Sequence, residues 1–470
     1  MTLSLEIAEW LTEWSKSSLG QQMLGPELSG RSADAAARRL RKAGLSLEQV
    51  VALAELAELR QRAASKFDCA HELFFTRRAY EQASGQATAQ WKHALLRAAW
   101  PTQPIVVLDL CCGIGGDLLE LARHFPVIGL DRDAALVHLL RENLRILAEK
   151  SPLCPHLMVS ADVTGVVPLA TAPPPTTETP NKDAARQPHL GGRPLREWLP
   201  TLPREVDAWA RDQDLLEHRV VWHLDPDRRD EAGRHTTLSK LSPDETFLAR
   251  LREWSNTGIV KLAPATELDE RWRALGHWQW LGRDRECKQL LGCFGFGDVL
   301  PAGAASVAVS RRGQSEWELW QPAVGGRETP PRCIQPLRYL YEPHPAFFAA
   351  RLGHALAAAE QWQWLAGGDY YTSNERSEPS GELFSAFQVL EVFPLRVAKI
   401  REWLVQQRRH LVEIKSRTVA EKDWKPLAAF LPGAPGRDEQ AGLSCLLFNE
   451  SKPGGKALRV ALCERLRKVT

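Results

Sequence analysis

The sequence predicts an α/β protein built on a mostly parallel sheet. Short runs rich in apolar and β-branched residues begin at Ile105; helical patterns separate the first three runs, and another follows the fourth. Near-continuous apolar strands that alternate with helices are typical of a parallel sheet covered on both faces. The expected strands are IVVLDL (105–110), VIGLD (127–131), HLMVS (156–160), VVWHLD (220–225) and GIVKLAP (258–264).

Residues 1–100 predict a helical region that precedes the sheet. Within residues 47–67, apolar side chains recur at the spacing of one helix face. They are Val50, Leu53, Leu56 and Leu59. The region has almost no strand signal, so we expect it to be all-helical.

The sheet domain is expected over residues 101–320, with a proline-rich insertion at residues 171–215. Eight prolines fall within residues 171–203. Proline lacks a backbone N–H and fixes φ, so this stretch predicts neither a regular helix nor a central strand. We expect an exposed, partly disordered insertion.

Two further segments follow the sheet domain: a mixed connecting segment, residues 321–394, and a small α+β module, residues 395–470. The module shows a helical pattern at 395–408, a strand at 411–416 and a hairpin of LSCLLFN with ALRVALC. Residues 396–470 hold 16 Lys and Arg against 8 Asp and Glu, whereas the whole chain has a net charge of only +2. This local excess is typical of a surface that meets phosphates. A merely solvated surface is the alternative.

The composition excludes several classes of protein. The nine cysteines are scattered and odd in number, and no Cys or His pair has zinc spacing, so we predict neither a disulfide framework nor a metal site. No run approaches about 18 uninterrupted apolar residues, so no membrane partner is predicted. Residues 1–11 lack the pattern of a secretory signal, and we expect a cytoplasmic protein.

The stretch DLCCGIGGDLLELA (109–122) predicts a ligand site at the end of the first strand. Asp109 closes the strand, and Gly113 and Gly115 permit a sharp turn that brings bare backbone N–H groups close to a ligand. Asp131 ends the second strand, and Asp162 follows the third. In open parallel sheets, ligands bind at the carboxyl ends of the strands.

S-adenosyl-L-methionine fits this arrangement best. A dinucleotide fingerprint requires glycine at position 118, which is leucine, and a phosphate-binding lysine followed by Ser or Thr is absent. Asp131 is placed to accept hydrogen bonds from both ribose hydroxyls, and Asp162 to meet the adenine amine. The alternative is a Rossmann-like domain whose acids merely cap helices.

The fourth expected strand runs into HLDPDRR (223–229), which predicts the reaction site. Asp225 and Pro226 are the catalytic candidates, with Asp225 orienting and deprotonating the acceptor group. The lack of a cysteine near this loop argues against cytosine-C5 chemistry, which needs a nucleophilic cysteine. Arg228 and Arg229 either hold a substrate phosphate or pair with Asp227 and Glu231. For Lys261, inside the fifth strand, the favoured interpretation is a salt bridge to a cleft carboxylate.

Six segments of the sequence carry a family resemblance. Five are VLDLCCGIGGDLLELA, DPDRR, RECKQLLGCFG, YLYEPHPAFFAARLGHALA and VLEVFPLRVAKIREWLVQQRRHLVEIKSR, and the sixth, nearer the N-terminus, is KFDCAHELFFTRRAYEQAS. Together the five resemble the bacterial class I S-adenosylmethionine-dependent methyltransferases that carry a C-terminal THUMP-like domain, and the sixth resembles the N-terminal region of the same family. The resemblance implies a Rossmann-type methyltransferase fold and RNA binding by the THUMP-like domain.

The cysteine pair of the turn is similar to that of RNA methyltransferases, including cap guanine-N2 enzymes. Cys111 occupies the place of a first glycine. By similarity to the cap enzymes, Phe75 and Thr76 line the cofactor site.

These observations predict a methyltransferase that modifies RNA. Two alternatives remain open: a methyltransferase for a protein or small molecule, and a non-catalytic protein that binds RNA and retains the cofactor as a structural ligand.

Overall fold

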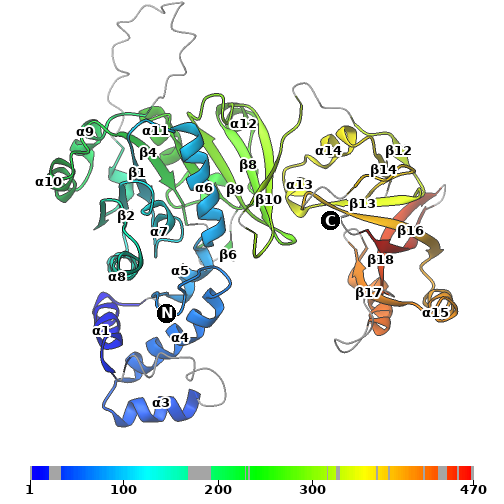
Figure 1. Cartoon of the computed structure of the whole chain (residues 1–470), viewed down its shortest axis with the longest axis horizontal. Helices are drawn as coiled ribbons and strands as arrows, with labels where there is room; N and C mark the ends of the chain where they lie inside the picture. Colours follow the sequence, from blue (N-terminus) through cyan, green and yellow to red (C-terminus); the bar gives the residue numbers. More distant parts are fainter. Residues whose placement is uncertain are drawn as a thin grey trace, which may run out of the picture. The chain divides into compact units, whose positions relative to one another are not determined.

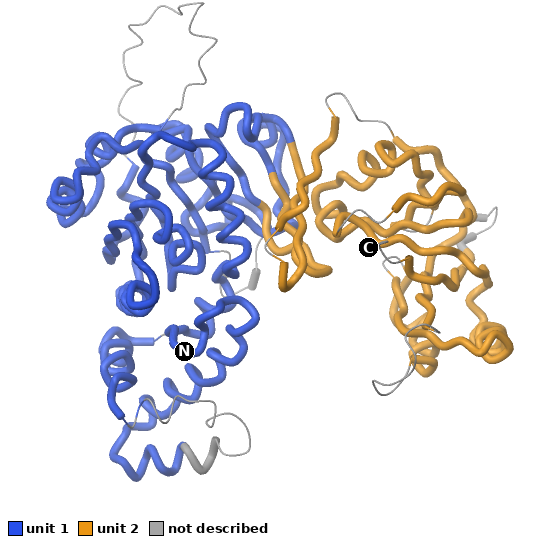
Figure 2. The backbone as a smooth tube through the Cα atoms, in the orientation of Figure 1, with its two compact units in different colours: residues 1–278, 291–304 blue, residues 279–290, 305–470 orange. Residues whose placement is uncertain are grey.

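The computed structural model describes most of the chain: residues 3–18, 20, 33–167, 192–227, 229–230, 233–234, 236–314, 316–323, 329–366, 369–378, 382–416, 419–431, 442–452 and 455–466. The chain divides into two compact units (Figure 2). One comprises residues 1–278 and 291–304, and the other residues 279–290 and 305–470.

A nine-stranded sheet carries the expected parallel strands, in the order β11-β10-β8-β9-β7-β4-β1-β2-β3. The parallel part consists of β1 (Ile105–Leu110), β2 (Val127–Asp131), β3 (His156–Ser160), β4 (Arg219–Leu224) and β7 (Gly258–Leu262). The central strand β1 is buried along its whole length. It pairs in parallel with β2 on one side and β4 on the other. All five strands predicted from the sequence are confirmed within two residues at each end.

The order reverses beside β1, because the chain moves outward through β2 and β3 and then returns to place β4 on the other side. This is the doubly wound, Rossmann-type arrangement, in which such a switch point marks the ligand crevice. The remaining strands of the sheet are β8 (His277–Arg283), β9 (Glu286–Phe294), β10 (Ala305–Ser310) and β11 (Glu318–Trp320), and β10 and β11 pair antiparallel.

Helices precede and accompany these strands (Figure 1). They are α1 (Leu5–Ser15), α3 (Ala33–Lys42), α4 (Leu47–Ala63), α5 (Arg77–Gln82), α6 (Gln86–Ala99), α7 (Leu118–Leu121), α8 (Ala134–Lys150), α11 (Glu245–Trp254) and α12 (Glu270–Leu275). The sequence signals explain α4: Ser46 and Gln49 form a capping box at its start, and the apolar stripe that begins at Val50 is buried. The predicted helical character of residues 1–100 is confirmed over the described residues.

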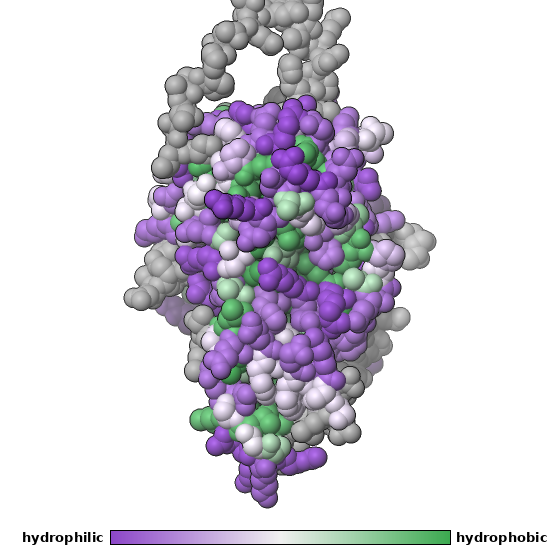
Figure 3. All heavy atoms as spheres, turned by 90° about the vertical axis from the view of Figure 1, so that its left-hand side faces the viewer, coloured by the Kyte–Doolittle hydropathy of each residue, from purple (hydrophilic) through white to green (hydrophobic). Residues whose placement is uncertain are grey.

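The face of the molecule in Figure 3 is mainly hydrophilic, with hydrophobic side chains confined to small patches. Within the described ranges, no helix has both the length and the apolar character that crossing a membrane requires.

The predicted insertion is corrected by the structure over its second half. Residues 195–212 form α9 (Leu195–Trp198), a 3-10 turn (Leu199–Thr201) and α10 (Arg204–Asp212). Leu195, Trp198 and Val206 are fully buried, so this part belongs to the packed domain. The prolines here lie outside the two helices or at their start, where a missing N–H costs nothing. The proline-rich residues 168–191 lie outside the described residues.

The second unit contains an eight-stranded sheet in the order β12-β14-β15-β13-β16-β19-β18-β17. The strands are β12 (Arg332–Cys333), β13 (Tyr339–Pro343), β14 (Gln363–Leu365), β15 (Tyr371–Ser373), β16 (Phe384–Pro394), β17 (His410–Lys415), β18 (Gly442–Lys452) and β19 (Gly455–Arg465). The predicted hairpin is confirmed, because β18 and β19 pair antiparallel. Residues from both predicted segments, 321–394 and 395–470, contribute to this one sheet.

The helices of the second unit are α13 (Pro345–Ala349), α14 (Gly353–Ala359), α15 (Val397–Gln406) and α16 (Glu421–Trp424). Helix α15 contributes Ile400 and Leu404 to a core with Leu411, Leu443 and Val460.

Candidate functional site

A cavity of about 240 Å³ lies at the carboxyl ends of β1, β2, β3 and β4. Eight of the predicted site residues line it: Thr76, Asp109, Cys111, Gly113, Asp131, Asp162, Asp225 and Pro226. The lining also includes residues that the sequence did not single out, among them Arg78, Gln82, Ser84, Asp117, His223 and Asp227. The three acids predicted at successive strand ends therefore share one cavity.

The glycine turn after β1 is held to the end of β2. The backbone N–H groups of Cys111 and Cys112 donate to the carbonyl of Leu130 at 2.9 and 3.1 Å. The Gly113 N–H donates to Asp131 Oδ2 at 2.8 Å. Gly113 has a φ of 54°, a left-handed conformation that side chains rarely adopt. The turn is thus pre-shaped by the same carboxylate that we predict to bind ribose.

Gly115 serves packing and does not line the cavity. Its φ is 88°, and a Cβ there would lie 2.4 Å from Leu140 Cδ1. Glycine is required because α8 approaches the turn this closely. The next residue, Gly116, does line the cavity, and a Cβ on it would meet the Ser84 backbone nitrogen at 2.7 Å.

Cys111 adopts a left-handed backbone conformation, with a φ of 65°. This conformation costs a non-glycine residue about 1–2 kcal/mol. Replacement by glycine removes this cost, but glycine also has more conformational freedom in the unfolded chain, which offsets part of the gain in stability. We therefore expect Cys111→Gly to stabilise the protein by up to about 1 kcal/mol in urea unfolding. Cys112→Gly is the matched control and should destabilise, because the Cys112 side chain is buried. Destabilisation by Cys111→Gly would contradict the inferred strain.

Asp131 has both carboxylate oxygens engaged by the backbone. Oδ2 accepts from Gly113, and Oδ1 accepts from the Asp133 N–H at 3.0 Å. Burial raises the pKa of Asp131, and these two hydrogen bonds work in the opposite direction. Each oxygen retains a further lone pair, so the fixed carboxylate can also accept from a ligand's hydroxyl groups.

Asp162 uses one oxygen for its own turn. Its Oδ1 accepts from the Thr164 N–H at 2.9 Å and the Thr164 hydroxyl at 2.8 Å. The backbone hydrogen bond lowers the pKa of Asp162. The other oxygen takes part in neither bond, which leaves it available for an amine donor. The capping alternative therefore holds in part for Asp162, without excluding a ligand.

A buried network of charged residues lies behind the turn. Lys92, on α6, is completely buried, and its Nζ lies 2.7 Å from Asp117 Oδ1. The same ammonium lies 3.2 Å from His223 Nε2, and His223 Nδ1 lies 2.7 Å from Asp109 Oδ1. An ammonium only donates, so Nε2 accepts and the ring proton sits on Nδ1, facing Asp109. Ser84 adds a hydroxyl that donates to Asp117 Oδ2 at 2.7 Å.

This network shifts the pKa values of its members in different directions. Burial raises the pKa of Asp109 and outweighs the attraction of His223. Burial also favours a neutral Asp117, but the ion pair with Lys92 outweighs it and holds the pKa of Asp117 well below its usual range. Burial lowers the pKa of Lys92. The network ties α6 to the ends of β1 and β4 and to the start of α7.

The side chain of Asp117 does not cap α7, although an aspartate at the start of a helix is a common cap. Asp117 is the N-cap residue of α7, but its side chain makes no capping hydrogen bond. It is turned toward Lys92 and Ser84, because a buried ammonium requires a carboxylate partner.

At the mouth of the cavity, Lys261 and Asp225 form the predicted salt bridge, with 2.5 Å between Nζ and Oδ2. Lys261 also donates to the Gln82 carbonyl at 2.8 Å. Asp227 pairs with Arg78, and the Gln82 side-chain amide donates to its Oδ1 at 2.7 Å. Helix α5 thus contacts the reaction loop through Arg78 and Gln82.

The other predicted site residues do not all line the cavity. Thr76 lines the cavity, and its hydroxyl caps α5 by accepting from Ala79 N–H. Phe75 is 3% exposed and is not part of the lining; its ring lies against Phe67 and Tyr80 in the core of the helical region. A phenylalanine with two aromatic neighbours gains more from packing there than from solvent contact. Arg228 and the side chain of Arg229 lie outside the described residues; of Arg229 only the strand β5 (Arg229–Asp230), which pairs with β6 (Gly233–Arg234), is described.

Some of the site residues that the sequence analysis did not single out carry a signal in the sequence. Lys92 falls on the stripe of α6 that also buries Thr88, Leu95 and Leu96, and a lysine at such a position implies a buried partner. His223 lies within a strand that is buried around it. Neither signal identifies the partner.

Comparison with solved structures defines the fold. The chain is similar to a protein from Porphyromonas gingivalis W83 that is provisionally named a methyltransferase, with a TM-score of 0.63 and 16% identity over 99% of this chain and 100% of that one. It also matches a Pyrococcus abyssi tRNA (uracil-54, C5)-methyltransferase in complex with S-adenosyl-L-homocysteine, at 15% identity over 41% of this chain and 30% of that one. That match has a TM-score of 0.20, too low to carry an argument. No protein-family model and no curated protein sequence matches the chain.

The first similarity extends over the whole length of both proteins. The chain has a Rossmann-like methyltransferase fold. Identity of 16% shows the fold alone.

Proposed function

We propose that this chain is an S-adenosyl-L-methionine-dependent methyltransferase. One observation carries the proposal: Asp109, Asp131 and Asp162, from three adjacent strand ends, line one cavity together with the glycine turn. A ribose acceptor, an acid for the adenine amine and bare backbone N–H groups are the features that this cofactor requires, and they lie at the switch point where the fold binds ligands.

In the proposed complex, Asp131 holds the ribose and Asp162 the adenine amine, and the turn at Gly113 lies beside the methionine end. The cofactor supplies an activated methyl group when bound. The protein's task is to align an acceptor atom with that methyl group, exclude water and accept a proton when the acceptor is an amine. Asp225 stands at the cavity mouth, where its carboxylate can orient the acceptor.

The salt bridge with Lys261 fixes Asp225 in place. Lys261 is buried and also contacts the Gln82 carbonyl, so the pair connects β7 with the loop after β4 and with α5. A fixed carboxylate is ready to accept a hydrogen bond from an acceptor group without further reorganisation.

Replacement of Asp225 separates catalysis from cofactor binding. We expect Asp225→Asn to reduce methyl transfer to RNA by about 10²–10⁴-fold, the range for loss of a positioned acid–base group. Binding of S-adenosyl-L-homocysteine, measured by calorimetry, should remain close to that of the unchanged protein. Asp207→Asn, in an exposed ion pair on α10, is the control and should leave both measurements unchanged. Full activity of Asp225→Asn would exclude the proposed role.

We propose RNA as the methyl acceptor, in line with the basic excess of residues 396–470. Four exposed basic residues on and beside α15 support this: Arg396, Lys399, Arg401 and Arg408. None of them forms an ion pair within the part of the chain that the structure describes, whereas Arg409, Arg459 and Arg465 pair with glutamates. Exposed basic side chains without an acidic partner are the type that contacts phosphates. We further propose that this part of the second unit is a THUMP-like domain.

The proposal that RNA is the methyl acceptor is tested by measuring how much labelled total RNA the full chain retains on a filter. We expect salt-sensitive retention, and replacing the four basic residues by glutamine should reduce the slope of log affinity against log salt by about 0.7 for each phosphate that the protein no longer neutralises. Replacing the ion-paired Arg62, Arg77, Arg145 and Lys150 is the matched control. Absence of retention, with cofactor binding intact, would favour a protein or small-molecule acceptor. Mass spectrometry of RNA nucleosides from a deletion strain and its parent would identify the product.

A further inference from the structure

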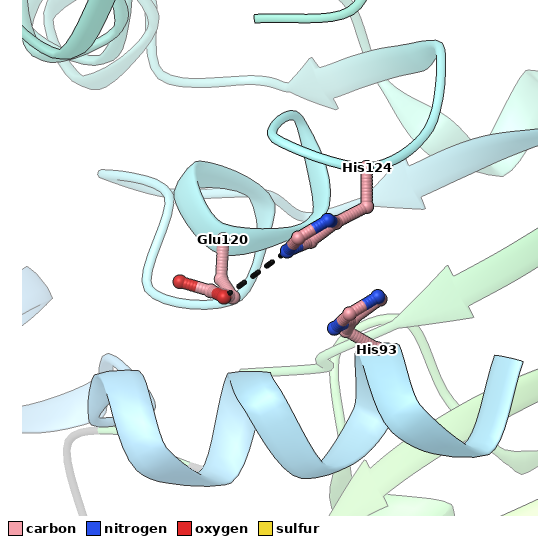
Figure 4. A group of neighbouring side chains, drawn as sticks. All are labelled: His93, Glu120 and His124. Carbon is pink, nitrogen blue, oxygen red and sulfur yellow. Dashed lines mark ion pairs between the residues drawn. The ribbon is translucent and has the colours of Figure 1, made fainter. Parts of the chain in front are cut away.

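Outside the cofactor cavity, three metal-ligating side chains converge between α6 and α7 (Figure 4). His93 projects from α6 toward Glu120 on α7 and His124 just beyond it. One ligand atom from each residue lies within 4.8 Å of the others. Two atoms bound to one zinc ion, each at about 2.1 Å, lie at most about 4.2 Å apart, so small side-chain rotations would bring all three into range.

Glu120 is the most informative member of this cluster. Its side chain is 9% exposed and accepts no hydrogen bond from the residues that the structure describes. Its contacts are His124 Nε2 at 3.4 Å and Arg123 Nε at 3.8 Å. A buried carboxylate normally accepts several short hydrogen bonds, so this one is poorly satisfied by the protein alone.

The two imidazole rings of the cluster lie face to face. They are stacked with centroids 3.5 Å apart and planes 4° apart. Two charged rings would repel each other in this arrangement. Neutral imidazole nitrogen is a metal ligand.

We propose that His93, Glu120 and His124 form a binding site for a divalent transition-metal ion of the zinc type. Two imidazole nitrogens and one carboxylate oxygen are a ligand set found at three-ligand zinc sites, with a fourth position for water. The sequence did not predict this site because His93 belongs to a different helix. The spacing of Glu120 and His124, four residues apart on one turn, is the only local signal.

A bound ion would hold α6 and α7 together next to the cofactor cavity. His93 follows Lys92 on α6, and Glu120 lies one turn beyond Asp117. The Lys92–Asp117 ion pair and the metal would therefore join the same two segments. The proposal does not depend on methyl transfer, because it concerns binding of the ion to the free protein.

Arg123 competes with the ion for Glu120. Its Nε lies 3.8 Å from Glu120 Oε2, whereas His124 faces Oε1, so the positive charge of Arg123 opposes a cation bound at this carboxylate. We therefore expect Arg123→Met to bind zinc more tightly than the unchanged chain.

The test is calorimetric titration of the untagged, chelator-treated full chain with Zn²⁺ in the absence of cofactor. We expect saturable binding of one ion and a rise in melting temperature that depends on zinc concentration. His93→Gln, His124→Gln and Glu120→Gln should each weaken binding by at least about 10–100-fold, the loss seen when even an outer partner of a metal ligand is removed. His71→Gln, at a 75% exposed histidine, is the control and should bind as the unchanged chain does.

Two results would overturn the proposal: no saturable binding of Zn²⁺, or binding that these three substitutions leave unchanged. Titration with Co²⁺ adds a spectroscopic readout, since a four-coordinate site with nitrogen and oxygen ligands gives visible absorption bands that aqueous Co²⁺ lacks. Thermal unfolding without metal shows whether each variant is folded. Glu120→Gln preserves the shape of the side chain, so it keeps the test valid if a histidine variant fails to fold.

Discussion

Replacement of Lys92 by methionine is expected to lower the free energy of unfolding by about 3–5 kcal/mol, the cost of removing one partner from a buried ion pair. The side chain of Lys92 is 0% exposed and that of its partner Asp117 is 4% exposed. Without the ammonium, Asp117 would be a buried carboxylate with only Ser84 and His223 near it. Urea denaturation measures the loss.

Two further variants show whether the loss of stability comes from the burial of the ion pair or from its charge. Lys16→Met removes an ammonium that is 43% exposed and pairs with Glu13 and Glu142, and it should cost no more than about 1 kcal/mol. Lys92→Met combined with Asp117→Asn should recover part of the stability, because no unpaired charge remains. A loss below about 1 kcal/mol for Lys92→Met would contradict the proposed network.

The same ion pair predicts how stability depends on pH. The pKa of Asp117 in the folded chain lies below its ordinary value of 3.8. A carboxylate with a lowered folded pKa contributes its full stabilisation above its unfolded pKa and loses it as the pH falls toward the folded pKa. We expect this acid-induced loss to be smaller in Lys92→Met. An unchanged acid profile, measured by urea denaturation from pH 7 to pH 3, would show that Lys92 does not act through Asp117.

Replacement of Asp131 by alanine is expected to weaken binding of S-adenosyl-L-homocysteine by at least about 100-fold. Hydrogen bonds to a charged group contribute about 1.5–3 kcal/mol each, and two ribose hydroxyls are proposed to donate to this carboxylate. Each 1.4 kcal/mol corresponds to about tenfold in affinity. The substitution also releases the N–H groups of Gly113 and Asp133, so the turn loses its support. Isothermal titration calorimetry measures the effect.

Asp133→Asn is a matched control for charge within the lining of the same cavity. It removes a carboxylate two residues further on, while asparagine still caps α8 in place of the Asp133 oxygen that accepts from Ala135 and Leu136. Its affinity should change little. Unchanged binding by Asp131→Ala would show that the cofactor, if bound, does not use this strand end.

Much of the fold follows from local patterns. The five parallel strands were predicted from apolar runs, and the hairpin of the second unit from two short apolar-rich segments, because burial of a segment is encoded in its own residues. The acids at the strand ends followed from the same reasoning, since parallel strands bring their carboxyl ends to one edge. The helices at residues 195–212 were missed because the prolines beside them obscured the helical pattern.

The sequence by itself determined where the strands lie, that a glycine turn follows the first of them, and that carboxylates stand at the strand ends. Only the tertiary structure decided which side chains pair: Lys92 with Asp117, His223 with Asp109, Arg78 with Asp227, and His93 beside Glu120 and His124. The physical reason is the range of the interactions. Periodicity reports how each segment meets water, whereas a buried charge must find its partner across the packed core, and residues distant in the sequence supply it.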